Sequence, residues 1–149
     1  GKISYELEKR LEAEGYRAKY LFISGSRVPS IPEPNPIYHL PDEEFKRELG
    51  RFEGTPKEVL ENQELLDFFL PMLRADFTMD ETYYDKAGIV LHTPIAAFGG
   101  EKDGEADESA ILEWGKYTDN DFNYRIFPGG HFYLRDCEDE VISEVMRLL

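Results

Sequence analysis

The chain has 149 residues, of which 41% are hydrophobic and 13% aromatic, enough for one ordinary hydrophobic core in a single domain. Its formal net charge of −14 repels phosphate backbones, and its lysines and arginines are scattered, so we expect no nucleic-acid partner. No stretch is long and apolar enough to cross a bilayer, and we therefore expect a cytoplasmic protein with no membrane partner.

The first two expected elements are a helix and a buried strand. Ile3, Leu7 and Leu11 recur at four-residue spacing, which predicts an amphipathic helix that ends near the next glycine. Residues 18–24 (AKYLFIS) are almost continuously apolar, as is typical of a central parallel strand covered on both faces. Because the sequence opens inside a helix, we expect the natural polypeptide to continue upstream of Gly1.

A long insertion follows the first strand. Residues 29–41 are rich in proline and cannot form a regular helix or an interior strand. Residues 55–58 (TPKE) predict a helix start in which the threonine is the N-cap of a capping box. From Asn62 the sequence predicts an apolar helix, broken or kinked near Pro71. This helix either packs in a core or forms a lid over an apolar binding cleft.

Two further strands are expected at residues 89–98 (IVLHTPIAAF) and 122–127 (FNYRIF), and the second alternates in a way that favours a position near an edge. Asp107 is expected to cap the helix between them, and Asp136 is expected to cap the C-terminal helix. Three strands that alternate with helices predict an α/β fold with an open, mostly parallel sheet.

Two glycine-rich loops carry the strongest candidate chemistry. Residues 99–104 (GGEKDG) and 128–131 (PGGH) each follow a predicted strand, where open α/β sheets assemble their sites. An acid that orients an imidazole must meet it at this edge, and Asp103 precedes His131 in the chain order of a hydrolase triad after its serine. On spacing alone, a solvated loop acid and a hydrogen-bonding histidine are favoured over catalytic roles for these two residues.

Other residues with suitable chemistry fit a site poorly. His39 lies in the proline-rich connection and His92 inside a predicted strand, so structural or surface roles are favoured. Acidic neighbours disfavour a thiolate at Cys137, the single cysteine. Ser4 is expected in a helix and Ser24 at a strand end without a nucleophile elbow, so neither suits attack on a substrate.

No metal or cofactor is expected. The alternating acids of residues 101–107 suggest a calcium loop, but the glycine stands at the fourth position of such a loop instead of the sixth, and Leu112 occupies the place of the bidentate glutamate. Three dispersed histidines and one cysteine do not form a zinc-binding cluster. The sequence also has no glycine-rich phosphate loop followed by Lys-Ser/Thr.

Six segments in a fixed order carry a family resemblance: 21–29 (LFISGSRVP), 40–45 (LPDEEF), 54–62 (GTPKEVLEN), 69–77 (FLPMLRADF), 94–100 (PIAAFGG) and 127–134 (FPGGHFYL). They resemble the type II, stand-alone thioesterases that accompany non-ribosomal peptide and polyketide synthases, over nearly the whole chain. The resemblance implies that residues 1–149 form the C-terminal part of an α/β-hydrolase domain, with a helical lid insertion at about 40–77.

The resemblance also assigns roles to residues. It implies that Asp103 is the catalytic acid, in a Gly-Asp-x-Asp-like loop where Glu101 replaces the earlier Asp, and that His131 is the catalytic histidine of a Gly-Gly-His-Phe element. The family's serine lies in a Gly-His-Ser-Met-Gly elbow just before the first helix, so the nucleophile and the oxyanion donors are expected upstream, and Gly1 is one candidate for the elbow's last glycines.

The implied activity is hydrolysis of acyl or aminoacyl thioesters on the phosphopantetheine arm of carrier proteins, which removes misplaced groups from stalled synthases. No cofactor is implied, and the 149 residues alone are expected to be inactive. The alternative is a non-catalytic binding module, or a half-domain that requires a partner chain, since missing strands would leave a sheet edge open.

Overall fold

A computed structural model describes residues 1–50, 52 and 54–149, which form two compact units. The first unit joins residues 1–31 to residues 85–149, and the second is the insertion Pro32–Tyr84.

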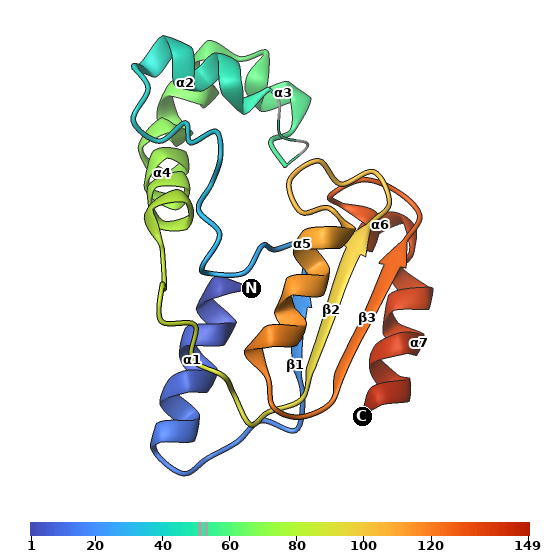
Figure 1. The fold of residues 1–149 in the computed structure, drawn as a ribbon. Coiled ribbons are helices and arrows are strands. Elements are labelled where there is room, and N and C mark those ends of the chain that lie inside the picture. Colours follow the sequence, from blue (N-terminus) through green and yellow to red (C-terminus); the bar gives the residue numbers. More distant parts are fainter. Residues whose placement is uncertain (51, 53) are drawn as a thin grey trace. The chain divides into compact units, whose positions relative to one another are not determined.

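The first unit is built on a parallel three-stranded sheet of order β1-β2-β3 (Figure 1). Its strands are β1 (Leu21–Ser24), β2 (Ile95–Gly100) and β3 (Phe122–Phe127). Its helices are α1 (Lys2–Ala13), α5 (Glu108–Leu112), the 3-10 helix η1 (Glu113–Tyr117), α6 (Tyr133–Asp136) and α7 (Glu138–Leu148). All three strands end at one edge, so the loops that follow them meet there.

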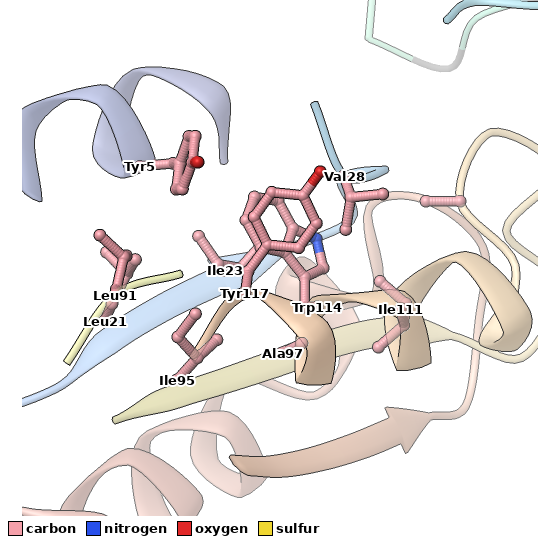
Figure 2. Packing of buried hydrophobic residues seen from close by; sticks show 11 residues of the cluster. Tyr5, Leu21, Ile23, Val28, Leu91, Ile95, Ala97, Ile111, Trp114 and Tyr117 are labelled. Atoms are coloured by element: carbon pink, nitrogen blue, oxygen red, sulfur yellow. The ribbon is translucent and has the colours of Figure 1, made fainter. Parts of the chain in front are cut away.

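Apolar side chains cover both faces of this sheet. On one face, Tyr5 of α1 packs edge-on against Trp114 and Tyr117 of η1, above Ile23 and other strand residues (Figure 2). On the other face, α6 and α7 pack on the sheet through a second cluster: Ala96, Phe98, Phe127, Tyr133, Cys137 and Val141. The central strand β2 is buried along its whole length, as its apolar sequence requires.

The second unit consists of α2 (Asp42–Leu49), α3 (Lys57–Leu60) and α4 (Gln63–Thr82). Its own core contains Ile37, Phe45, Leu49, Leu66 and Leu70. The helix α4 also has a row of exposed apolar side chains at helical spacing: Leu65, Phe68, Met72 and Met79.

The strands follow the sequence prediction in part. The strand at 122–127 has the predicted bounds and lies at one end of the sheet, as expected. The prediction that the second strand starts at residue 89 is wrong, because β2 starts at Ile95. The backbone before it binds α1 instead: the Tyr5 hydroxyl donates to the Ile89 carbonyl, and Glu12 accepts from the amides of His92 and Thr93.

The first helix forms, but it buries another face than its leucine spacing suggests. Ile3 is 68% exposed and Leu7 is 56% exposed, whereas Tyr5 and Glu8 are buried. Tyr5 fills the aromatic cluster, and the Glu8 carboxylate accepts hydrogen bonds from the Ala18 amide and the Thr93 hydroxyl. The strand that follows was predicted to be central, but among the described strands β1 pairs only with β2.

One of the three predicted helix caps is confirmed, since Asp107 accepts from the Ala110 amide. Asn62, which was not predicted to be a cap, accepts from two amides at the start of α4. The prediction of a capping box at residues 55–58 is wrong, because the N-cap residue of α3 is Pro56 and no side chain caps this helix. The cap at Asp136 is wrong because that residue ends α6. The helix that was predicted to be broken or kinked near Pro71 is not broken there, since α4 continues through this residue.

No helix in the described part of the chain is long and apolar enough to cross a membrane.

Candidate active site

The loops after β2 and β3 are joined by backbone hydrogen bonds. The Glu101 amide donates to the Phe127 carbonyl at 2.9 Å, and the Lys102 amide donates to the Gly129 carbonyl at 2.8 Å. A Cβ at Gly100 would lie only 2.2 Å from the Gly130 carbonyl oxygen, so only glycine allows this approach. The two loops therefore lie in direct backbone contact at the carboxyl edge of the sheet.

This contact between the two loops brings Asp103 and His131 together. The Asp103 Oδ2 atom lies 2.9 Å from His131 Nδ1, the carboxylate is fully buried, and the imidazole side chain is 35% exposed. The second carboxylate oxygen accepts from the amides of Glu105 at 2.8 Å and Ala106 at 3.1 Å. Because an ionised carboxylate only accepts hydrogen bonds, Nδ1 carries the proton in this pair.

The electrostatics favour an ionised acid. Burial raises the pKa of Asp103, but the hydrogen bond from His131 and those from the Glu105 and Ala106 amides outweigh burial, so the net pKa lies below its ordinary value. A buried carboxylate with both oxygens occupied can orient an imidazole and stabilise it when it takes up a proton.

A third loop, after β1, closes over this pair and was missed by the sequence reasoning. Gly25 has a φ of +52°, and a Cβ there would lie 3.1 Å from His131 Cε1 and 3.6 Å from Asp103 Oδ2. The preceding residue, Ser24, shares a 2.6 Å hydrogen bond with the hydroxyl of Tyr133. The Ser-Gly pair directly after a predicted strand was the one available signal for this loop.

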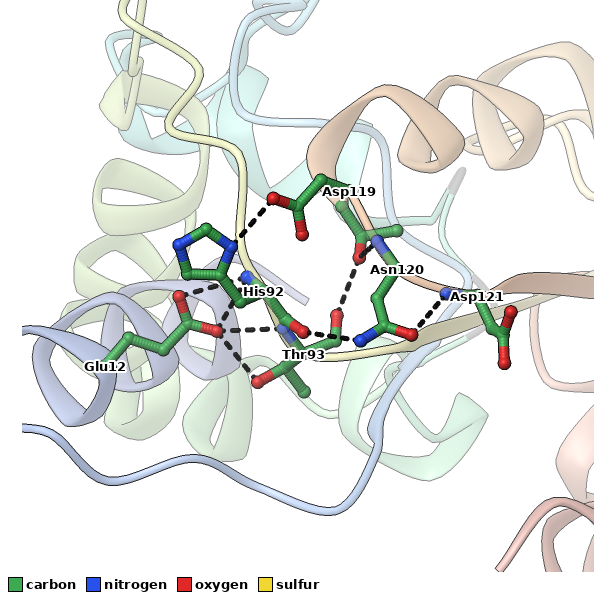
Figure 3. Close-up of polar contacts among 7 residues, drawn as sticks. Glu12, His92, Thr93, Asp119, Asn120 and Asp121 are labelled. Atoms are coloured by element: carbon green, nitrogen blue, oxygen red, sulfur yellow. Dashed lines mark hydrogen bonds and ion pairs between the residues drawn. The ribbon is translucent and has the colours of Figure 1, made fainter.

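The histidine at position 92 belongs to a different cluster, at the opposite edge of the sheet from Asp103. It lies in the loop before β2, and its Nδ1 atom is 2.7 Å from Asp119 Oδ2, with both side chains more than half exposed. Asn120 Nδ2 donates to the His92 carbonyl, so this cluster holds the turn in place (Figure 3). The predicted structural or surface role agrees with this placement.

The remaining candidates also lie outside the pair. Cys137 is buried, its Sγ donates to the Pro128 carbonyl, and burial together with Glu140 and Asp136 raises its pKa. His39 packs against the ring of Tyr38 in the second unit. Ser4 lies within α1, as predicted. Among the residues that the structure describes, no group of His, Cys, Asp and Glu is arranged to hold a metal ion.

Comparisons with known proteins find a family model and several relatives that match this chain. The family model described as a thioesterase domain matches residues 1–149. The gramicidin S biosynthesis protein GrsT of Aneurinibacillus migulanus is 36% identical over 99% of this chain and 58% of its own length. Thioesterase PikA5 of Streptomyces venezuelae is 34% identical over 96% of this chain and 51% of its own length.

Solved structures agree with these relatives. YbtT, a type II thioesterase from the yersiniabactin NRPS/PKS biosynthetic pathway, superposes with a TM-score of 0.87 at 30% identity, over 96% of this chain and 59% of YbtT. Human thioesterase 2 superposes with a TM-score of 0.70 at 20% identity, over 98% of this chain and 66% of its own, which bears on the fold alone. The predicted α/β-hydrolase fold class is confirmed, although the chain spans only about half to three-fifths of its curated relatives.

Proposed function

The chain belongs to the thioesterase domain family, as its sequence resemblance indicated, and on this premise we propose that it supplies the acid and the histidine of a serine-hydrolase triad. The observation that carries the proposal is the buried hydrogen bond between Asp103 and His131 at the carboxyl edge of the sheet. The nucleophilic serine and its oxyanion donors come from polypeptide upstream of Gly1.

The proposed reaction is acyl transfer to serine and then to water. His131 Nε2 takes the serine proton as Oγ attacks the thioester carbonyl, and it returns that proton to the sulfur as the C–S bond breaks and the thiol leaves. Water then loses a proton to His131 and attacks the acyl-serine carbonyl, and His131 returns that proton to serine Oγ as the C–O bond breaks and the acid leaves. Throughout both steps Asp103 holds the Nδ1–H tautomer and stabilises the imidazolium.

We propose acyl and aminoacyl groups on the phosphopantetheine arm of carrier proteins as substrates, and removal of misplaced groups from stalled synthases as the role. The support is that YbtT is a type II thioesterase from an NRPS/PKS pathway and GrsT a gramicidin S biosynthesis protein. The helical lid that we propose at about residues 40–77 lies within the second unit, whose helix α4 exposes Leu65, Phe68 and Met72.

The direct test is hydrolysis of an acyl-pantetheine thioester by the chain extended upstream to the length of its relatives. Turnover should be lost in His131→Ala, while the matched variant His92→Ala, which removes the exposed histidine of the other cluster, should retain it. Turnover that survives in His131→Ala would contradict the proposal. The unextended 149 residues should be no faster than their own His131→Ala variant.

A second candidate, a half-domain that requires a partner chain, is favoured by one observation. The outer edge of β1 has no neighbouring strand among the described residues, and Ile3 and Leu7 of α1 are exposed. Size-exclusion chromatography separates the two cases: a stable monomer contradicts an open edge, whereas an obligate dimer supports pairing.

A further inference from the structure

The loop after β1 touches the Asp103–His131 pair through backbone alone. Gly25 adopts the left-handed region, with a φ of +52°, and its amide donates to the carbonyl of Phe98 in β2. A Cβ added there would lie 3.1 Å from His131 Cε1 and 3.4 Å from Nδ1. The Gly25 backbone therefore packs on the same edge of the ring that binds Asp103, next to the hydrogen bond itself.

A side-chain hydrogen bond ties this loop to the histidine loop. Ser24, adjacent to Gly25, and Tyr133, two residues after His131, share a 2.6 Å bond between their hydroxyls. Tyr133 is fully buried, stacks on Phe127 with ring centroids 5.2 Å apart, and donates its amide to the Gly130 carbonyl. The bond thus closes a short ring of contacts that runs from Gly25 through Ser24 and Tyr133 to His131.

The Tyr133 hydroxyl keeps its proton at all ordinary pH values. Burial, and to a smaller extent the charge of Asp103, raises the pKa of Tyr133 to about 12, against the opposing effect of the Ser24 hydrogen bond. The bond joins this buried hydroxyl to the exposed Ser24 and is itself partly buried. In Ser24→Ala the Tyr133 hydroxyl loses its partner and has to bind water, and in Tyr133→Phe the Ser24 hydroxyl turns to solvent. In both variants the side-chain link between the two loops is lost.

From this geometry we propose that Ser24 and Tyr133 are positioning residues, which hold the Gly25 backbone against the imidazole and so keep His131 Nδ1 on Asp103. Without the bond, the Gly25 loop moves away from the ring edge, and water competes with the carboxylate for Nδ1–H. The inference deepens the proposed function and rests on it for its catalytic meaning, but it concerns a hydrogen bond that is measured without any turnover.

The test is the His131 Nδ1–H proton resonance in the 15N-labelled chain extended upstream to the length of its relatives, with its rate of exchange with water. We expect this proton to exchange up to about tenfold faster in Ser24→Ala and in Tyr133→Phe, since tenfold corresponds to about 1.4 kcal/mol, the upper end of what one partly buried hydrogen bond contributes. The double variant should exchange no faster than the single ones, because both substitutions break the same bond.

The chain offers a matched control. Tyr117 and Ser30 share a tyrosine–serine hydroxyl bond of 2.7 Å in the same unit, on the opposite side of the sheet from Tyr133. Tyr117→Phe should lose comparable stability while leaving the His131 exchange rate unchanged. Because a lost hydroxyl could also loosen the whole unit, exchange of the β2 amides is followed in every variant, and only His131 should respond in Ser24→Ala and Tyr133→Phe.

The possible results distinguish failure of the positioning role from failure of the proposed function. An unchanged His131 exchange rate in both Ser24→Ala and Tyr133→Phe, or an equal rise in Tyr117→Phe, overturns the positioning role and leaves the proposed function untouched. If the unsubstituted chain protonates Nε2 instead of Nδ1, the Asp103–His131 pair fails, and the proposed function fails with it. If the positioning role holds but the extended enzyme does not hydrolyse thioesters, only the proposed function is overturned.

Discussion

His131 Nδ1 lies 2.9 Å from Asp103 Oδ2, although each residue belongs to a loop that follows a different strand. Two features bring them together: the parallel register, which ends β2 and β3 at the same edge, and the glycine at position 100, which lets the loops approach. The hydrogen bond between the two residues therefore depends both on the strand register and on the contact between the loops. Each of these dependences can be tested by substitution.

The first prediction concerns the acid. In the extended enzyme, Asp103→Asn keeps the size of the side chain but replaces an acceptor with an amide that can donate to Nδ1, which favours the wrong tautomer. We expect kcat to fall by about 10⁴-fold, as for other triads. Asp119→Asn, which alters the exposed pair with His92, is the control and should change kcat little. A loss of less than tenfold in Asp103→Asn would remove Asp103 from the triad.

The second prediction follows from the lowered pKa of Asp103. A carboxyl group with a pKa below its unfolded value, about 3.9, stabilises the fold above that value, and the contribution is lost as the pH falls through the folded pKa. The difference in unfolding free energy between the unsubstituted chain and Asp103→Asn should therefore be constant from about pH 4 to 5 and shrink below about pH 4. Urea titrations at pH 2.5 to 5 measure it, and a difference that grows on acidification contradicts the assigned direction.

The third prediction tests the close approach of the two loops. An alanine at position 100 would place its Cβ 2.2 Å from the Gly130 carbonyl oxygen, so Gly100→Ala should destabilise the chain by about 3 kcal/mol, as overpacking does. A Cβ added at Gly104 in the same loop would have no atom within 4 Å, so Gly104→Ala should leave stability within about 0.5 kcal/mol. Equal effects in urea unfolding would show that the loops do not meet as described.

The fourth prediction concerns the buried carboxylate of α1. Glu8 is 2% exposed and accepts from the Ala18 amide and the Thr93 hydroxyl. Glu8→Ala leaves the partly buried Ala18 amide without this acceptor and leaves the Thr93 hydroxyl only Glu12 as a partner, so it should cost about 1 kcal/mol, whereas Glu14→Ala at the exposed end of α1 should cost little. Thermal unfolding of both variants decides whether this polar contact, instead of the leucine spacing, determines which face of α1 is buried.

Sequence reasoning worked where the signal is local. The apolar run at 122–127 has the bounds of β3, and Asp107 caps the helix that follows it, because strand formers and capping side chains act on their immediate neighbours. The glycine-rich loops after β2 and β3 were also recognisable, since their position follows from the strands themselves.

Contacts between residues far apart in the sequence could not be predicted in this way. The start of β2 depends on Glu12, which takes amides that would otherwise pair in the sheet, and the buried face of α1 depends on Tyr5 and Glu8. The approach of Gly25 to His131 joins residues far apart in the chain, and no periodicity reports it. Such contacts become visible only when the strands are placed side by side.

The central claim is that Asp103 and His131 are two members of a triad whose serine lies upstream in the same polypeptide. The most direct measurement is the sequence of the coding DNA immediately before the codon of Gly1. The expected result is an in-frame Gly-His-Ser-Met-Gly elbow or a close variant of it. A start codon at that point, with no serine elbow in the reading frame, would contradict the claim and favour the half-domain or binding-module alternative.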